Sequence, residues 1–338
     1  MTWVDELRAH EAVFRRAPSA HNTQPWTLDY RADEVVIGVD PARSLPASDP
    51  TGRDLALGLG AFAETCLIVA AGAGLAVGCA LDGDGRIRLV RAARVYATPF
   101  TAGDVAARRV ARGAYRPGVV LPGDVRGLED GLVHVPSREL AADLARADRW
   151  MFGSPPVVGE LRAWLRLDPR DPRYGEDGLT GPALGLGRVA ARALDVALRG
   201  YRVLRPWGLP AALAAGSRGV LRYDGSVFVL TGRPGEDPRE AGRRLLRTWL
   251  TLGRHGLAVH PLSQLIDCPS TAARLAGRVG ALPLAVFRVG RPRHEPPRSA
   301  RLPAGPIRSA RLPAGRSAQS SDGRSGIPRT GRRGKGSL

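Results

Sequence analysis

Apolar residues recur every three or four positions in two long stretches of the chain, a spacing that gathers them on one face of an α-helix. The first stretch begins at Asp49-Pro50, a capping residue and a first-turn proline, and ends near Gly72 or Gly74. The second begins at Asp237-Pro238 and ends at Gly256. The periodic apolar residues are Leu55, Leu59, Phe62, Cys66 and Val69 in the first stretch and Leu245, Trp249 and Leu252 in the second. Both stretches predict long amphipathic helices.

Short apolar segments bounded by turn residues predict β-strands. These segments are Trp26–Tyr30, Val35–Val39, Leu75–Leu81, Ile87–Val90 and Leu284–Val289. The first two are separated by Arg-Ala-Asp and predict a hairpin at the edge of a sheet, and residues 82–85 form a turn between the next two.

The remaining pattern predicts further helices and one long irregular segment. Helices are expected over residues 5–16 and 138–165, the latter broken into two at Ser154-Pro155-Pro156. Residues 166–185 show no periodicity. A loop of this length inside a compact domain is either a lid over a binding site or a surface connection, and both interpretations remain open.

The two long helices share their surroundings. Each begins at Asp-Pro, and each is followed by Gly-Leu-Ala-Val, at residues 74–77 and 256–259. The matching cap, helix and exit predict an internal duplication, with two halves related by a pseudo-twofold axis. We place the first half at residues 1–135 and the second at 136–305.

The formal net charge of +18 is concentrated near the C-terminal end. Residues 291–338 hold 12 Arg or Lys against 2 acids, which gives +10 there and +8 for the first 290 residues. This segment contains RSARLPAG twice, at 298–305 and 308–315, and little apolar content. We therefore expect a disordered basic tail over residues 306–338. The hypothesis that the protein binds nucleic acid rests on this tail alone. It predicts an affinity for nucleic acid that falls steeply as the salt concentration rises.

Cysteine, histidine and hydropathy patterns argue against several classes of protein. Cys66, Cys79 and Cys268 are neither even in number nor closely spaced, so we expect small core residues. Of the histidines only His255 and His260 lie near one another, which is not a metal motif. No run of 18 apolar residues exists and the N-terminus is polar, so we expect a cytoplasmic protein without a membrane partner.

The most unusual segment is the loop APSAHNTQPW at residues 17–26, in which hydrogen-bonding residues stand between two prolines. Ser19, His21, Asn22 and Gln24, with adjacent backbone N–H groups, could bind the edge of a flat heterocycle or a phosphate. From the residues alone, a purely structural loop is the favoured interpretation, and a binding loop is the alternative.

This loop resembles the one near the start of nitroreductase-family flavoproteins, and its position resembles the actinobacterial branch of single-chain NAD(P)H nitroreductases. Three later segments resemble the same branch in the same order: residues 49–77, 243–264 and 282–301. Together they span most of the part of the chain expected to fold. The resemblance implies an α+β fold with a central antiparallel or mixed sheet flanked by helices.

The resemblance also implies which residues bind flavin mononucleotide (FMN). The loop residues Ser19, His21, Asn22 and Gln24 would contact the flavin, and the segment after the late helix would lie beside its ring. The closing element would meet the ribityl phosphate, which suits two guanidiniums and a hydroxyl. These later positions are Pro261, Leu262, Ser263 and Gln264 beside the ring and Arg298, Ser299 and Arg301 at the phosphate.

Some positions depart from the family pattern. The basic element that usually stands well before the loop is replaced by Arg15 and Arg16, directly against it. Thr27 follows the loop where arginine is common. The second RSAR copy offers Arg308 and Arg311 as alternative phosphate ligands.

The resemblance implies an FMN-dependent oxidoreductase that takes hydride from NAD(P)H and reduces a small acceptor such as a nitroaromatic or a quinone. Family members are homodimers, whereas the duplication predicts a monomer with a dimer-like body, and both states remain open. An alternative is a protein of the same fold that sequesters FMN without turnover, with residues 166–185 blocking nicotinamide. The flavin would perform the redox chemistry, so no catalytic side chain is expected.

Overall fold

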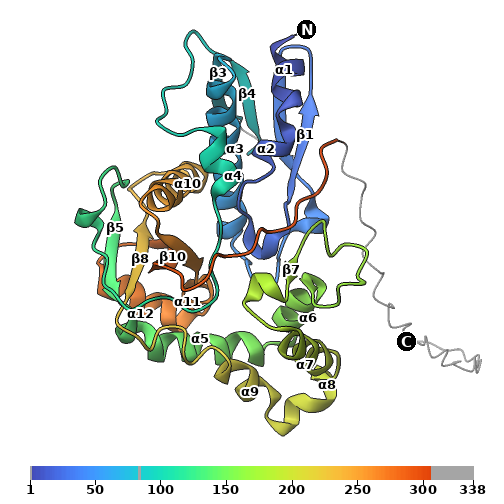
Figure 1. Ribbon diagram of the computed structural model, residues 1–338, viewed down its shortest axis with the longest axis vertical. Helices are drawn as coiled ribbons and strands as arrows, with labels where there is room; N and C mark the ends of the chain where they lie inside the picture. Colours follow the sequence, from blue (N-terminus) through green and yellow to red (C-terminus); the bar gives the residue numbers. More distant parts are fainter. Residues whose placement is uncertain (1, 83–84, 306–338) are drawn as a thin grey trace, which may run out of the picture. The chain divides into compact units, whose positions relative to one another are not determined.

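Two four-stranded antiparallel sheets and the helices packed on them form the protein in the computed structural model, which describes residues 2–82 and 85–305 (Figure 1). The first sheet has the order β1 (Trp26–Tyr30), β2 (Glu34–Val39), β4 (Ile87–Arg91), β3 (Val77–Leu81). The second has the order β5 (Leu132–Pro136), β8 (Ser226–Thr231), β10 (Pro283–Gly290), β9 (Ala258–Pro261). The predicted tail at 306–338, with Arg308 and Arg311, lies outside the described residues.

The two sheets follow the same path along the chain. In each, the first two strands are neighbours, a long helix comes next, and the fourth strand then inserts between the second and the third. The helix is α3 (Arg53–Gly72) in the first half and α10 (Pro238–Arg254) in the second. The remaining helices are α1 (Trp3–Ala9), α2 (Glu11–Phe14), α4 (Ala102–Ala107), α5 (Ala141–Gly153), α6 (Pro155–Ala163), α7 (Arg188–Arg199), α8 (Tyr201–Leu204), α9 (Leu209–Ala215), α11 (Gln264–Asp267) and α12 (Pro269–Val279).

Helices α3 and α10 pack directly on each other at two glycines. A methyl group added at Gly60 of α3 would collide with the main-chain carbonyl of Arg239, and one added at Gly242 of α10 would collide with that of Leu57. Each helix therefore approaches the backbone of the other through its own glycine, which only a residue without Cβ permits.

Each long helix also covers its own sheet. In the first core, Phe62 and Cys66 of α3 pack with Trp26, Ile37 and other strand residues. Trp26 stacks on Phe62 with ring centroids 4.4 Å apart. In the second core, Leu245, Trp249 and Leu252 of α10 pack with Phe228 and Phe287. The far face of the second sheet is covered by α5, α11 and α12.

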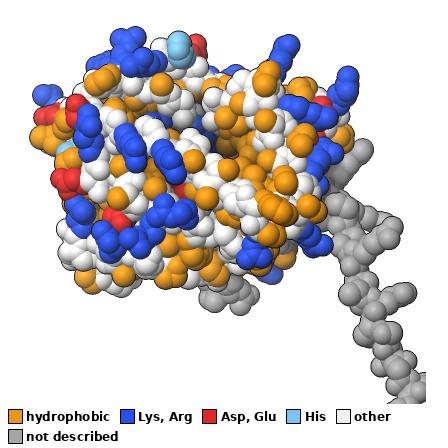
Figure 2. Space-filling model, turned by 90° about the horizontal axis from the view of Figure 1, so that it is seen from below, with side chains coloured by type: hydrophobic (Ala, Val, Ile, Leu, Met, Phe, Trp, Pro, Cys, Tyr) orange, Lys and Arg blue, Asp and Glu red, His pale blue; other side chains and the backbone are white. Residues whose placement is uncertain are grey.

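The second half carries a long insertion, residues 137–225, between its first two strands. This insertion contains α5 to α9 and a small parallel pair of strands, β6 (Leu165–Arg166) and β7 (Leu179–Thr180). Figure 2 views the molecule from the end at which α7, α8 and α9 lie, and it shows apolar side chains gathered there beside arginines.

The structure confirms most of the predicted elements and corrects several. The α+β class and the antiparallel pairing are confirmed, but there are two four-stranded sheets where one central sheet was expected. Two separate sheets form because α3 packs on the first sheet and α10 on the second, while the two helices pack on each other between the sheets. The helix expected over 5–16 is two helices that break at His10, and α3 begins at Arg53, after Gly52 with φ of +69°.

Helix α3 is long and apolar enough by composition to cross a membrane, as no other helix of the described residues is. In the protein, 78% of its most apolar window is buried. Its apolar character is therefore that of a central core helix enclosed by both halves.

Candidate functional site

A cavity of about 360 Å³ lies between the two long helices, the N-terminal loop and the insertion. This volume is in the range of small-molecule sites in proteins. Helix α3 contributes one wall, β9 with the loop into α11 another, and the insertion a third. The insertion residues of the wall are Trp150, Met151, Phe152, Val157, Leu161, Leu165, Leu179, Leu184 and Leu194. The cavity is mainly apolar, with a few polar groups at its edge.

The structure brings the two segments that were assigned to the flavin ring to this one cavity. Ser19 and His21 of the N-terminal loop line it, as do Pro261, Ser263 and Gln264 after β9. These segments are far apart in the chain and meet because β9, at the edge of the second sheet, packs on α10, which in turn packs on α3. The local sequence of either segment does not show that the two line the same cavity.

Three other predicted residues support the site from behind. Asn22 is buried and donates from Nδ2 to the carbonyls of Gly178 and Ala300, both at 3.1 Å. Gln24 is fully buried and donates to Glu176 O at 2.9 Å. Leu262 is buried in the second-half core, and its N–H donates to Val286 O.

The backbone of the loop is strained at the predicted residues. Among the described residues, His21, Asn22 and Gln24 are the non-glycine residues with positive φ, at +46°, +56° and +52°. A left-handed conformation costs about 1–2 kcal/mol for a residue with Cβ. Strain of this kind persists where surrounding contacts hold it and concentrates at functional sites.

Two histidines face the cavity in their neutral form. Burial lowers the pKa of His21, with a smaller contribution from the Arg112 charge. Burial also lowers the pKa of His260 well below its usual range, and Arg288 and Arg112 add to the effect. The Nδ1 atoms of both rings are buried, and no residue in the described part of the chain hydrogen-bonds to them. Buried polar atoms without partners are rare in proteins, so these two nitrogens mark positions at which a ligand atom could bind.

Two aspartates and an arginine form a cluster at the N-terminal end of α3. Arg53 contacts Asp54 and Asp267, both with nitrogen–oxygen distances of 2.7 Å, and all three residues line the cavity. Burial, together with the nearby Asp54, raises the pKa of Asp267 to about 7. A carboxyl group with this pKa can hold or release a proton at neutral pH.

A group of arginines lies where the N-terminal helices end, and its members are not among the residues that line the cavity. We call Arg16, Arg108, Arg109 and Arg298 the arginine group. Arg109 and Arg298 share the carbonyl of Ala106, and Arg108 donates to the carbonyl of Arg16. The Arg108 guanidinium lies 6.0 Å from the ring centroid of Trp249, which lines the cavity.

The arginine group has unused hydrogen-bond donors. Nε and Nη1 of Arg108 and Nε of Arg16 are buried and have no hydrogen-bond partner among the described residues. Burial and the charges of Arg16 and Arg109 lower the pKa of Arg108 to about 10. Like charges with free donors are the chemistry of an anion site.

Of the residues expected at the phosphate, one belongs to the arginine group and the other two contact it through Arg16. Arg298 joins it, and Ser299 accepts through its carbonyl from Arg16 at 3.0 Å. Arg301 instead donates to the carbonyls of Arg15, Arg16 and Ala17 and to the Asn22 side chain. The Arg301 guanidinium thus holds the C-terminal end of α2 against the loop.

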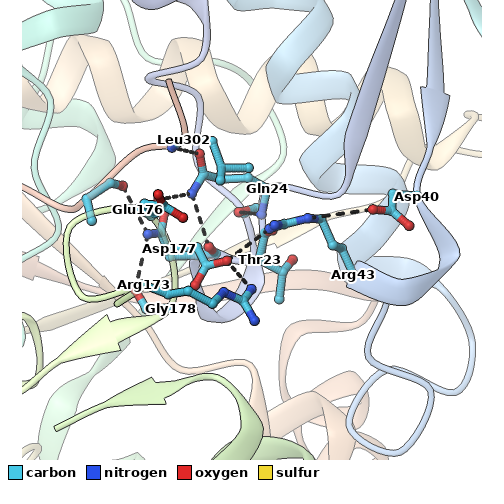
Figure 3. A network of polar contacts seen from close by, with 12 residues as sticks. Thr23, Gln24, Asp40, Arg43, Arg173, Glu176, Asp177, Gly178 and Leu302 are labelled. Atoms are coloured by element: carbon cyan, nitrogen blue, oxygen red, sulfur yellow. Dashed lines mark hydrogen bonds and ion pairs between the residues drawn. The ribbon is translucent and has the colours of Figure 1, made fainter. Parts of the chain in front are cut away.

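The segment predicted as a lid is held in place by a buried ion-pair network (Figure 3). Asp177 is fully buried and contacts Arg43 at 3.1 Å, Arg166 at 2.8 Å and also Arg173. Arg43 also donates to the carbonyl of Thr23. Because Asn22 and Gln24 hydrogen-bond the same stretch at residues 176–178, the network joins the insertion to the N-terminal loop.

Sequence reasoning missed several residues of the site. Arg108, Arg112, Trp249 and Asp267 carried no motif, and each faces the site only through tertiary packing. Trp249 was assigned to the core face of its helix, and it both packs on Phe287 and lines the cavity. A search of the described residues shows no cluster of side chains that could hold a metal ion.

Comparison with known proteins gives a partial similarity. No family model matches the chain. Over 74 residues, 22% of the chain, the sequence is 35% identical to the protein named "Putative NAD(P)H nitroreductase acg" of Mycobacterium tuberculosis, in the CDC 1551 / Oshkosh strain and in the H37Rv strain. The match spans 22% of the length of these relatives. The similarity to a protein of this name is therefore limited to about a fifth of either chain.

Proposed function

We propose that the chain binds FMN in the cavity and uses it to pass hydride from NAD(P)H to a small acceptor such as a nitroaromatic or a quinone. One observation carries the proposal. The segments around His21 and Pro261, which the resemblance assigns to the flavin, line one cavity, and Trp249 of that cavity lies 6.0 Å from the guanidinium of Arg108, which has unused donors.

The residues present fit this cofactor. An apolar cavity suits a flat aromatic ring, and the free Nδ1 atoms of His21 and His260 can bind polar atoms at its edge. The free donors of Arg16 and Arg108 suit a phosphate dianion. The flavin, when bound, supplies the redox chemistry.

The chain's own residues would orient the ring, exclude water and supply a proton. The apolar wall formed by the insertion excludes water, which strengthens polar contacts inside. Reduction of a nitro group or a quinone consumes protons, and Asp267 can hold one at neutral pH because its pKa is about 7.

We also propose that the two halves descend from one ancestral unit by duplication. Their common strand order and the reciprocal glycine contacts at Gly60 and Gly242 support this origin. A single chain would then provide the pairing that two subunits give in dimeric flavoproteins. We accordingly propose a monomer, which the molar mass in solution would test.

The first experiment is to titrate the full chain with FMN and with riboflavin, which lacks the phosphate. We expect FMN to bind more tightly, because charge-assisted hydrogen bonds contribute about 1.5–3 kcal/mol each. The Arg108→Gln variant should lose about 10- to 100-fold in FMN affinity and none in riboflavin affinity. Retained riboflavin binding also shows that the variant is folded.

Arg138→Gln provides the matched control, because Arg138 is exposed and pairs with Asp224 away from the cavity. It should bind both ligands as the unaltered chain does. A chain that binds neither FMN nor riboflavin would refute the proposal. If Arg108→Gln loses equal affinity for FMN and for riboflavin, the arginine group does not bind the phosphate of FMN.

Sequestration of FMN without turnover is the second candidate function, and the buried network at Asp177 favours it. Leu165, Leu179 and Leu184 line the cavity on a segment that this network holds in place. A fixed cover would keep nicotinamide from the ring. Anaerobic addition of NADPH to the loaded protein separates the two functions, since bleaching of the flavin absorbance indicates a reductase and a constant spectrum indicates sequestration.

A further inference from the structure

Helix α7 has apolar side chains on two opposite faces. Ala191, Leu194 and Leu198 face the protein, and Leu194 lines the cavity. Val189 and Val196 lie on the opposite face and are 85% and 55% exposed. Residues seven apart in a helix share one face, so the outer valines form a stripe. This stripe has no partner among the described residues.

The exposed apolar surface continues along the chain beyond α7. Val203 of α8 is 71% exposed, and Trp207, in the short turn η6 (Arg205–Trp207), is 85% exposed. Five of the eleven exposed large hydrophobic side chains of the described residues lie within 189–207. Leu204 shares a shallow groove with the outer face of α7. We call residues 188–207 the α7–η6 surface; Figure 2 views the molecule from this end.

The charge of the α7–η6 surface is strongly positive. It holds five exposed arginines, and its single acid is Asp195. Asp195 is already paired with Arg192 and Arg199. The arginines of this surface are Arg188, Arg192, Arg199, Arg202 and Arg205. An exposed apolar stripe with an exposed tryptophan and neighbouring arginines is the chemistry of a helix that lies in the interface of an anionic membrane.

We propose that the α7–η6 surface docks on an anionic lipid surface. Val189, Val196, Val203 and Trp207 enter the region of the headgroups, and the arginines bind lipid phosphates. The protein is then peripheral and no helix spans the membrane. This inference departs from the expectation that the chain has no membrane partner, and it does not rest on the proposed cofactor.

The test is cosedimentation of the full chain with vesicles of phosphatidylcholine alone and with vesicles that also contain phosphatidylglycerol. We expect binding to the anionic vesicles that weakens with salt. The basic C-terminal segment can also bind anionic lipid, so the decisive variants alter the α7–η6 surface and leave that segment intact. They are the double variant Val189→Glu and Val196→Glu, and Trp207→Ala.

The double variant should lose at least about tenfold in affinity for anionic vesicles, because two carboxylates would enter a negatively charged interface. Val119→Glu is the matched control, since Val119 is 57% exposed outside this surface. It should bind as the unaltered chain does. The substituted positions are exposed, so the fold and the cavity are expected to be unchanged.

Three results would overturn the proposal. The first is equal binding to neutral and anionic vesicles, or none to either. The second is an unchanged affinity in the double variant, which would assign the binding to the basic C-terminal segment. The third is an unaltered chain that sediments as a dimer and a double variant that sediments as a monomer, which would make this surface an interface between two copies.

Discussion

Replacing Asp177 with asparagine is expected to destabilise the fold, because it removes the carboxylate that neutralises three arginines. The Asp177 side chain is fully buried, and those of Arg43 and Arg166 are 3% and 5% exposed. These two arginines and Arg173, the third partner of Asp177, also lie over the ring of Trp164 at 5.4–5.8 Å. The three arginines therefore depend on one carboxylate, and little water can reach them to solvate their charges when it is removed.

The expected loss is about 3 kcal/mol, at the lower end of the 3–5 kcal/mol that follows when one partner of a buried ion pair is removed. Asparagine keeps an acceptor oxygen and a similar shape, so the cavity and packing contributions are small. Asp40 remains 3.6 Å from Nε of Arg43 and compensates part of the lost charge. A loss of this size is a large fraction of the 5–15 kcal/mol typical of folded domains.

Urea unfolding measures the effect, with a lower midpoint and an unchanged m-value expected for Asp177→Asn. Asp29→Asn is the matched control, because Asp29 is 61% exposed and pairs with the exposed Arg31. That substitution should change stability by less than about 1 kcal/mol.

A loss below about 1 kcal/mol in Asp177→Asn would refute the reasoning, since it would mean that water or other acids already balance the arginines. If the variant does not fold, Arg173→Gln tests the same argument. Arg173 is the most exposed of the three arginines, at 24%, so its removal should cost only about 1 kcal/mol.

Two further predictions concern the helix contact and the buried histidines. Gly242→Ala should cost at least about 2 kcal/mol in urea unfolding, because the new methyl group meets the carbonyl of Leu57. Gly277→Ala in α12, with no atom within 4 Å of the new carbon, should instead stabilise by about 0.5–1 kcal/mol, and equal effects of the two would contradict the packing argument. Burial depresses the folded-state pKa of His260 below its usual 6.5, so the unfolded chain binds more protons and stability falls as the pH drops below 6.5. His260→Gln should reduce this loss by up to about 1.4 kcal/mol per pH unit, and an unchanged pH profile would show that the pKa of His260 is the same in the folded and the unfolded chain.

Local patterns were enough to locate the regular elements whose signals lie within a few residues. Asp237-Pro238 caps α10 as predicted, because the aspartate side chain accepts from the Arg239 N–H. At α3 the same dipeptide misled: Asp49 accepts from the Leu55 N–H across a turn at Gly52, and the helix starts later. A capping pattern fixes which groups can bond, whereas the turn before it decides where the helix begins.

The insertion was the part of the chain that the sequence predicted least well. Helices α5 and α6 were expected from the prolines at 155 and 156, but α7 to α9 were missed. Helix α7 is amphipathic, but Val189 and Val196 interrupt its arginine-rich outer face. Its outer face became interpretable only when the structure showed which residues are exposed.

The sequence by itself determined the local pieces of this protein: the strand and helix segments, the polar loop at 17–26 and the repeated Asp-Pro, helix and Gly-Leu-Ala-Val pattern. Only the tertiary structure decided that two sheets form, that His21 and Pro261 share a cavity, and that Arg301 holds backbone carbonyls while Arg108 keeps free donors. The physical reason is distance along the chain. Capping and periodicity act over a few residues, whereas the cavity arises where segments hundreds of residues apart exclude water from one another.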